Sequence, residues 1–269
     1  MFIWSRTDAP GPGRRGVRFA FTSRHGGASA PPWDSLNLGG GSGDDPQAVE
    51  HNRRVVAAEL AVPRDRLLFM RQCHGAEVCV ATAPWGERAG GPPEVDALVT
   101  TRDDLAVAAL AADCVPVLLA DAQAGVVAAV HSGRPGLAQA VVVRAVERMR
   151  GLGATRISGV VGPAVCGRCY EVPAAMRDEV AAVVPESACT SWSGTPALDI
   201  AAGVVAQLRG AGVEVEHVSR CTRESPELYS YRRDGATGRF AGVIRLLPAL
   251  PALPDSSVLS FSLPVRSGR

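Results

Sequence analysis

The chain has 269 residues, of which 46% are hydrophobic and 20% charged, and this balance is typical of a folded protein with enough apolar material for one large α/β domain. The formal net charge is +1, so the molecule lacks the long-range field that attracts nucleic acid or an anionic membrane. Lysine is absent, which excludes lysine Schiff-base chemistry and a Walker A phosphate loop. We therefore expect a small-molecule ligand, whose anionic groups are bound by arginine or backbone amides, and neither nucleic acid nor a membrane as partner.

Cysteine usage indicates a reducing compartment. The seven cysteines are spread along the chain without the density of a disulfide framework, and no apolar secretory segment is apparent at the start of the sequence. The most apolar stretch, residues 105–130, contains Asp113, Pro116 and Asp121, so it could not cross a bilayer without burying charge. We expect a cytoplasmic, monomeric protein.

The first part of the chain combines a strand, a polar connector and a helix. Residues 17–22 predict a strand, and residues 30–45 are rich in Pro, Gly and Ser, which favours a flexible connector over a phosphate loop. Asp45 followed by proline is a good helix start. On that helix Asn52 and Arg53 could turn toward a ligand, but their spacing alone favours the surface.

Apolar runs rich in Val, Ala and Leu then predict a largely buried sheet. The predicted fold class is mixed α/β (α+β), with one domain over residues 1–247, its sheets flanked by helices, and a flexible Pro/Ser-rich tail over residues 248–269. Strands are expected at residues 67–70, 77–82, 96–100, 105–111, 115–120, 125–130, 157–161, 213–218 and 239–247, and helices at residues 135–150, 173–184 and 197–210.

Three candidate metal ligands, His74, Cys114 and His131, each stand at a strand end or turn. Two imidazoles and one thiolate leave a tetrahedral Zn²⁺ one position short, as in catalytic zinc sites. Copper is less favoured, because an oxidase with several coppers needs many more than the five histidines of this chain. Two alternatives remain open: Cys114 as a buried apolar side chain, or Cys114 as a nucleophile with His131 as its base.

Cys166 and Cys169 form a CxxC motif, which is typical of zinc or redox sites. A structural zinc would need a second pair, and the other cysteines form no pair of short spacing. We therefore expect these two residues to be structural thiols near the site.

Seven segments together resemble the YfiH/laccase-domain family, whose members have been called multicopper polyphenol oxidases, peptidoglycan editing factors and purine nucleoside phosphorylases. The resemblance runs from about Phe19 to Leu246, in family order. The segments are TSRHGG (22–27), SLNLG (35–39), QCHG (72–75), ADCVP (112–116), VHSG (130–133), GPAVCGRCYEV (162–172) and SYRRDG (230–235).

This resemblance implies a single α/β domain with mixed sheets and one zinc ion bound by His74, Cys114 and His131. It also implies zinc-dependent phosphorolysis of adenosine, inosine, guanosine and methylthioadenosine, with phosphate as the second substrate, together with deamination of adenosine.

The residues expected to act in that chemistry follow from the resemblance and from the absence of lysine. Asp113 is a candidate proton shuttle or holder of a ligand imidazole, with equal weight on each role. The expected catalytic residues are Cys114, Asp113 and His74, and the expected substrate and phosphate contacts are Arg24, Asn37, Arg53, Arg232 and Arg233.

One segment departs from the family pattern. Relatives commonly read His-Ala-Gly-Trp-Arg-Gly where this chain has His131-Ser-Gly-Arg134-Pro135-Gly. We expect this change to alter substrate preference and to leave metal binding intact. A cysteine hydrolase that edits peptidoglycan precursors, a copper-dependent polyphenol oxidase and a non-catalytic binding module are the competing functions.

Overall fold

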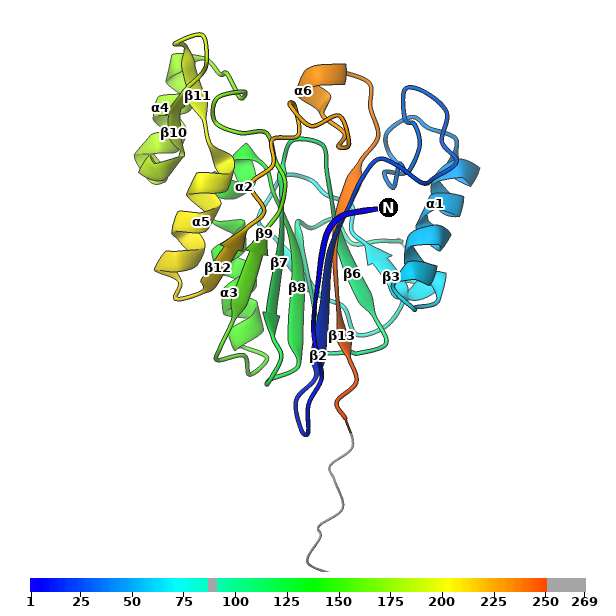
Figure 1. Ribbon diagram of the computed structural model, residues 1–269. Helices are drawn as coiled ribbons and strands as arrows, with labels where there is room; N and C mark the ends of the chain where they lie inside the picture. Colours follow the sequence, from blue (N-terminus) through cyan, green and yellow to red (C-terminus); the bar gives the residue numbers. More distant parts are fainter. Residues whose placement is uncertain (87–90, 251–269) are drawn as a thin grey trace, which may run out of the picture.

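Two β-sheets packed face to face form the centre of the protein, with helices on both outer faces (Figure 1). The computed structural model describes residues 1–86 and 91–250. The predicted mixed α/β domain is confirmed.

The six-stranded sheet has the order β12-β9-β7-β8-β5-β4 and mixes parallel with antiparallel pairs. Along β7, Val117 and Leu119 face the helices, while Leu118 and Ala120 face the other sheet. Both faces are therefore buried, which explains the continuous apolar runs in the sequence. The strands are β4 (Val78–Val80), β5 (Ala97–Thr100), β7 (Val115–Asp121), β8 (Val126–Ser132), β9 (Ser158–Val161) and β12 (Glu214–His217).

The five-stranded sheet has the order β1-β2-β13-β6-β3. Its inner face packs Phe19, Phe21 and Val107 against the first sheet, and its outer face carries α1. The strands are β1 (Phe2–Asp8), β2 (Gly16–Thr22), β3 (Leu67–Phe69), β6 (Ala106–Ala111) and β13 (Phe240–Leu247).

The helices lie outside the two sheets or at one end of them (Figure 1). Asp45 caps α1 by accepting from the N–H of Gln47, as its place before Pro46 predicts. The helices α3 and α5 pack on the six-stranded sheet. The elements are α1 (Pro46–Glu59), α2 (Arg134–Ala138), α3 (Val141–Arg150), α4 (Ala174–Val183), α5 (Ile200–Gly210), α6 (Tyr231–Asp234), the short 3₁₀ helices η1 (Arg64–Arg66) and η2 (Pro185–Ser187), and the hairpin strands β10 (Ala188–Thr190) and β11 (Pro196–Leu198).

The structure corrects several predictions from the sequence. The single helix expected over residues 135–150 is divided into α2 and α3, because Ala140 takes a left-handed conformation with φ of 58°. The helix expected over residues 197–210 begins only at Ile200, where Asp199 caps it, and β11 precedes it. Asn52 is buried instead of lying on the surface. The sequence did not predict β1 or the β10–β11 hairpin.

The predicted tail over residues 248–269 falls largely on residues 251–269, outside the described part of the chain. Within the described part, Leu250 forms a bridge to Pro12. No helix in the described ranges has the length and apolar character to span a membrane.

Candidate metal and substrate site

The three predicted metal ligands converge. His74 lies between β3 and β4, Cys114 lies in the turn between β6 and β7, and His131 lies on β8. Their donor atoms all lie within 4.8 Å of one another, and Cys114 Sγ is 3.8 Å from His74 Nε2. The two imidazole rings stand nearly perpendicular, at 84°, with centroids 4.8 Å apart. This arrangement could hold one metal ion with three protein ligands.

Asp96, which the sequence analysis did not select, fixes both histidines. Its buried carboxylate is 2.8 Å from Nδ1 of His131, so the Nε2 atom of that ring is left to face a metal. The same carboxylate accepts from the backbone N–H groups of Cys73, His74 and Gly75. These bonds hold the loop in which His74 has the strained φ of 60°. Asp96 therefore orients two of the three candidate ligands.

Gly133 provides the space beside these ligands. A Cβ atom at this position would lie 2.8 Å from Cδ2 of His74 and 3.2 Å from Sγ of Cys114. Only glycine allows the backbone to pass this close to both side chains. The donor types, the oriented imidazole and this close approach all fit a zinc ion.

The electrostatics of the site favour a thiolate. Burial alone would raise the pKa of the Cys114 thiol, but the charge of His131 and hydrogen bonds from His131 and His74 lower it to about 6. Burial would also raise the pKa of Asp96, but hydrogen bonds from His131, Cys73 and Gly75 lower it to about 2. Cys114 and Asp96 are thus disposed to be anionic while His131 carries a second proton, and a cation bound in place of that proton would favour the same two negative charges.

Asp113, next to Cys114, is engaged away from the metal ligands. Its Oδ1 atom accepts from the hydroxyls of Thr222 at 2.6 Å and Ser230 at 2.7 Å, and its Oδ2 atom accepts from the N–H of Arg232 at 2.6 Å. Its φ is 97°, so the turn that presents Cys114 is strained and held by these bonds. The carboxylate that holds a ligand imidazole is Asp96 and not Asp113. Asp113 instead positions the turn that presents Cys114.

A cavity of about 810 Å³ opens beside the three ligands, and it is rich in arginine. Arg53 and Arg232, both predicted substrate contacts, line it together with Arg239. Burial lowers the pKa of Arg53 to about 10, with a contribution from Arg64. Burial also lowers the pKa of Arg239, while the charges of Cys114 and Asp113 oppose that shift. The volume suits a nucleoside-sized ligand, and the arginines suit an anion.

Arg24, Asn37 and Arg233, which were predicted to bind substrate, do not line this cavity. Arg24 donates to the carbonyl and carboxylate of Asp34, and Arg233 donates to backbone carbonyls at residues 222, 225 and 228. The amide oxygen of Asn37 accepts from the N–H groups of Gly39 and Arg239. These side chains hold loops together outside the cavity lining, and their contact with substrate stays a prediction.

Comparison with known proteins identifies the family. A family model described as multi-copper polyphenol oxidoreductase laccase matches residues 18–247. The chain belongs to this family.

Individual proteins also resemble this chain. A Streptomyces coelicolor protein named as a purine nucleoside phosphorylase is 56% identical over 234 residues, which cover 86% of this chain and 96% of the relative. A Streptomyces griseus protein of the same name is 54% identical over 250 residues, covering 91% of this chain and all of the relative. The crystal structure of the hypothetical protein YfiH of Bacillus licheniformis matches with a TM-score of 0.79 and 30% identity, covering 86% of this chain and 93% of that one.

The family description names several coppers, but the described residues offer few histidines to bind them. Among the described residues of this chain, two groups of side chains could hold a metal, and together they contain only the imidazoles of His74 and His131. A group of several coppers with histidine ligands has no counterpart there. The cavity contains three donors, His74, Cys114 and His131, which could hold one metal ion.

The segment that departs from the family pattern lies at this laccase-domain site. Arg134 begins α2 and lines the cavity, and the ring of Pro135 suits the first turn of that helix. Gly133, just before Arg134, lies against the candidate ligands His74 and Cys114. The altered turn thus forms part of the cavity wall next to the candidate ligands.

Asp96 and Arg239 are the functional positions that sequence reasoning missed. Asp96 stands immediately before β5, and a carboxylate at the start of a wholly buried strand is a signal of a buried polar network. Arg239 stands immediately before β13 and gave no comparable signal, because its approach to the cavity depends on the loop contact with Asn37.

Proposed function

We propose that this chain is a zinc-dependent purine nucleoside phosphorylase that also deaminates adenosine. The convergence of His74, Cys114 and His131 beside an arginine-lined cavity carries the proposal. The names of the two Streptomyces relatives support the same reaction class. The proposed substrates are adenosine, inosine, guanosine and methylthioadenosine, each with inorganic phosphate.

In phosphorolysis, a phosphate oxygen forms a bond to C1′ of the sugar while the bond from C1′ to the purine nitrogen breaks. The products are the free base and the sugar 1-phosphate. In this chain, Arg53, Arg232 and Arg239 would bind the phosphate through charged hydrogen bonds, in a cavity without any lysine. Deamination in the same cavity would replace the C6 amino group of adenosine with oxygen from water and release ammonia.

The proposed ligands and their partners would hold the reacting groups in place. Bound zinc would supply a Lewis acid with one coordination position left open by the protein. Asp96 would keep His131 in the tautomer that presents Nε2, through its contact with Nδ1. Asp113 would position Cys114 on one side and Arg232 on the other.

A cysteine hydrolase is the second candidate, and one observation favours it. Asp96, His131 and Cys114 form a chain of carboxylate, imidazole and thiol like that of a nucleophile, its base and the group that orients the base. The proximity of His74 to the same thiol favours the metal instead, because a nucleophile needs no third donor.

The direct test is to incubate the purified protein with each nucleoside, with and without phosphate, and to quantify the products by chromatography. Free base should form only with phosphate, and inosine should form from adenosine without it. Cys114→Ala should abolish both, whereas Cys189→Ala should not. Zinc-loaded protein that releases no base from any of these nucleosides would refute the proposal. Activity that resists chelators and is abolished by thiol alkylation would favour the hydrolase.

We also propose that the protein works as a monomer in a reducing cytoplasm. Cys73, Cys114, Cys166, Cys169, Cys189 and Cys221 are unoxidised thiols in the described part of the chain, as is usual for proteins of a reducing compartment. Size-exclusion chromatography with light scattering measures the oligomeric state.

A further inference from the structure

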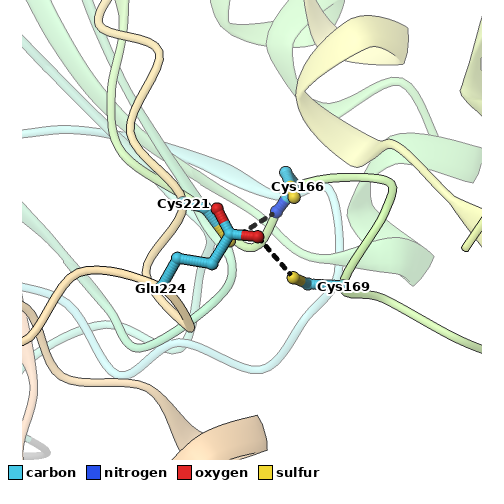
Figure 2. Close-up of side chains that lie close together, drawn as sticks. All are labelled: Cys166, Cys169, Cys221 and Glu224. Carbon is cyan, nitrogen blue, oxygen red and sulfur yellow. Dashed lines mark hydrogen bonds between the residues drawn. The ribbon is translucent and has the colours of Figure 1, made fainter. Parts of the chain in front are cut away.

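A second group of metal-binding side chains lies apart from the three ligands described above. It consists of Cys166, Cys169, Cys221 and Glu224, whose sulfur and carboxylate atoms all lie within 4.8 Å of one another. Figure 2 shows the four side chains gathered between two loops. The prediction that the CxxC motif has no partner of short spacing was therefore incomplete. The partner is the pair Cys221 and Glu224, which mixes a thiol with a carboxylate.

The two pairs of donors lie in loops that follow neighbouring strands. The loop with Cys166 and Cys169 follows β9, the loop with Cys221 and Glu224 follows β12, and these strands are adjacent and parallel. Their loops therefore leave the sheet at the same edge. A bridge between Ala164 and Cys221 continues the pairing beyond the strands. The common spacing of three residues and the shared edge bring the four donors together.

Each loop is folded so that its two donors face the other pair. The N–H of Cys169 donates to the carbonyl of Cys166 at 2.9 Å, which closes a tight turn. The N–H of Ser225 donates to the carbonyl of Cys221 at 3.0 Å, which closes the second turn. Between the loops, the N–H of Cys166 donates to Sγ of Cys221 at 3.4 Å, and Sγ of Cys169 lies 3.2 Å from Oε1 of Glu224 (Figure 2).

We propose that Cys166, Cys169, Cys221 and Glu224 form a second, structural zinc site. Three thiolates and one carboxylate complete a tetrahedral set, whereas the group at the cavity supplies only three donors. On binding, zinc would displace one proton from each thiol into solvent, and the carboxylate would bind in its ionised form. Zinc is favoured over magnesium or calcium because three of the four donors are sulfur.

The two groups are connected through Asp113. Thr222, which follows Cys221, donates to the Asp113 carboxylate, and the N–H of Val165, which precedes Cys166, donates to its carbonyl at 3.0 Å. A zinc ion clamping the two loops would therefore hold the residue that precedes Cys114. The second site is a positioning element for the first.

Zinc stoichiometry in the full-length protein, purified under reducing conditions without chelator, tests the proposal. The wild type should contain two zinc ions per chain, and both Cys114→Ala and the double variant Cys169→Ser/Cys221→Ser should contain one. Cys189→Ser is the matched control and should keep two. Its sulfur lies beside Gly167 in the CxxC loop, where an added Cβ atom would be only 2.7 Å away, but it is not one of the four donors.

If the double variant does not fold, the second site can be tested by cobalt spectroscopy of the single variant Cys114→Ala. Cobalt replacing zinc in Cys114→Ala should show the intense visible and thiolate charge-transfer bands of a tetrahedral site with three sulfur ligands. Glu224→Gln, a change at an exposed side chain, should lower the affinity of that site for cobalt at least tenfold. One zinc per wild-type chain that disappears in Cys114→Ala would overturn the inference, as would a disulfide among these thiols. That result would leave the proposed phosphorylase activity standing. Zinc bound at this second group in a protein without turnover would instead support the second site and refute the phosphorylase.

Discussion

At the scale of single residues, the site depends most on Asp96. This carboxylate lies in the interior of the protein, accepts from three consecutive backbone N–H groups in the His74 loop and contacts Nδ1 of His131. A buried carboxylate costs free energy unless such donors compensate it. Here the same contacts that compensate the charge also orient two candidate ligands.

Replacement of Asp96 by asparagine should therefore weaken metal binding. The Asp96 carboxylate contacts five groups: three backbone N–H groups, the Cys73 thiol and Nδ1 of His131. The single oxygen of an amide cannot accept from all of them, so His74 and His131 would be less well ordered. We expect zinc affinity at this site to fall about 10- to 100-fold, measured by competition with a chromophoric chelator. Asp65→Asn, a change at an exposed aspartate, is the control. Unchanged zinc affinity in a folded Asp96→Asn variant would contradict the positioning role.

Arg232 is the proposed phosphate contact that can be removed with the least structural damage. Its side chain is exposed, stacks over Tyr170 at 4.5 Å and donates to the carbonyl of Glu171. Loss of one charged hydrogen bond, about 1.5 kcal/mol, corresponds to roughly a tenfold rise in KM for phosphate in Arg232→Ala. The KM for nucleoside should change less. Arg144→Ala, on the outer face of α3, should change neither constant.

At the scale of elements, the turn after β7 is held by one buried side chain. Asp121 accepts from the N–H groups of Gln123 and Ala124 within its own turn and from those of Thr155 and Arg156 in the segment that leads to β9. Burial alone would raise the pKa of Asp121, but these four backbone donors lower it. This carboxylate thus ties three neighbouring strands of the six-stranded sheet together.

Asp121→Asn should lower the free energy of unfolding by about 2–4 kcal/mol at pH 7, because an amide places a donor where two N–H groups need an acceptor. Since the pKa of Asp121 is lowered in the folded protein, its contribution is complete above the pKa of the unfolded chain, about 4, and is lost as the pH falls below it. The difference between variant and wild type should therefore narrow from pH 7 to pH 3 in urea titrations, with Asp65→Asn as control. A difference independent of pH would show that the charge is not responsible.

The sequence predicts some elements well and others poorly for physical reasons. Buried strands such as β7 and β8 are predicted because apolar residues occupy both of their faces. The strand β1 is half exposed and mixes Arg and Asp with aromatics, so it lacks that signal. The division between α2 and α3 rests on the backbone of Ala140, and alanine carries no sign of a left-handed conformation.

At the scale of the whole molecule, the site lies where the two sheets meet. His74 and Cys114 stand on segments that cross from the five-stranded to the six-stranded sheet, and His131 lies within the six-stranded sheet. The identities of the ligands could be predicted because a thiol and two imidazoles stand at strand ends or turns, and because the resemblance to the family selects the same three residues. Their distances could not, because these distances depend on how the sheets pack.

The arginines that line the cavity could not be selected from the sequence for the same reason. Arg24, Arg53, Arg232 and Arg233 are equivalent as cations in the sequence, but only Arg53 and Arg232 line the cavity. Arg24 and Arg233 instead satisfy carboxylate or carbonyl oxygens of neighbouring loops. Arg53 and Arg232 also donate to carbonyls, those of Leu38 and Glu171, but they do so from the wall of the cavity. Which arginine reaches the cavity is decided by loop packing between distant segments.

The dependence of phosphorolysis on zinc can be measured by removing the metal and returning it. The protein should be treated with a strong chelator, assayed for phosphate-dependent release of adenine from adenosine, and assayed again after addition of zinc or of copper. We predict that release stops on chelation and returns with zinc but not with copper. Full release of adenine by protein from which all zinc has been removed, or none by protein with zinc restored, would contradict a zinc-dependent phosphorylase.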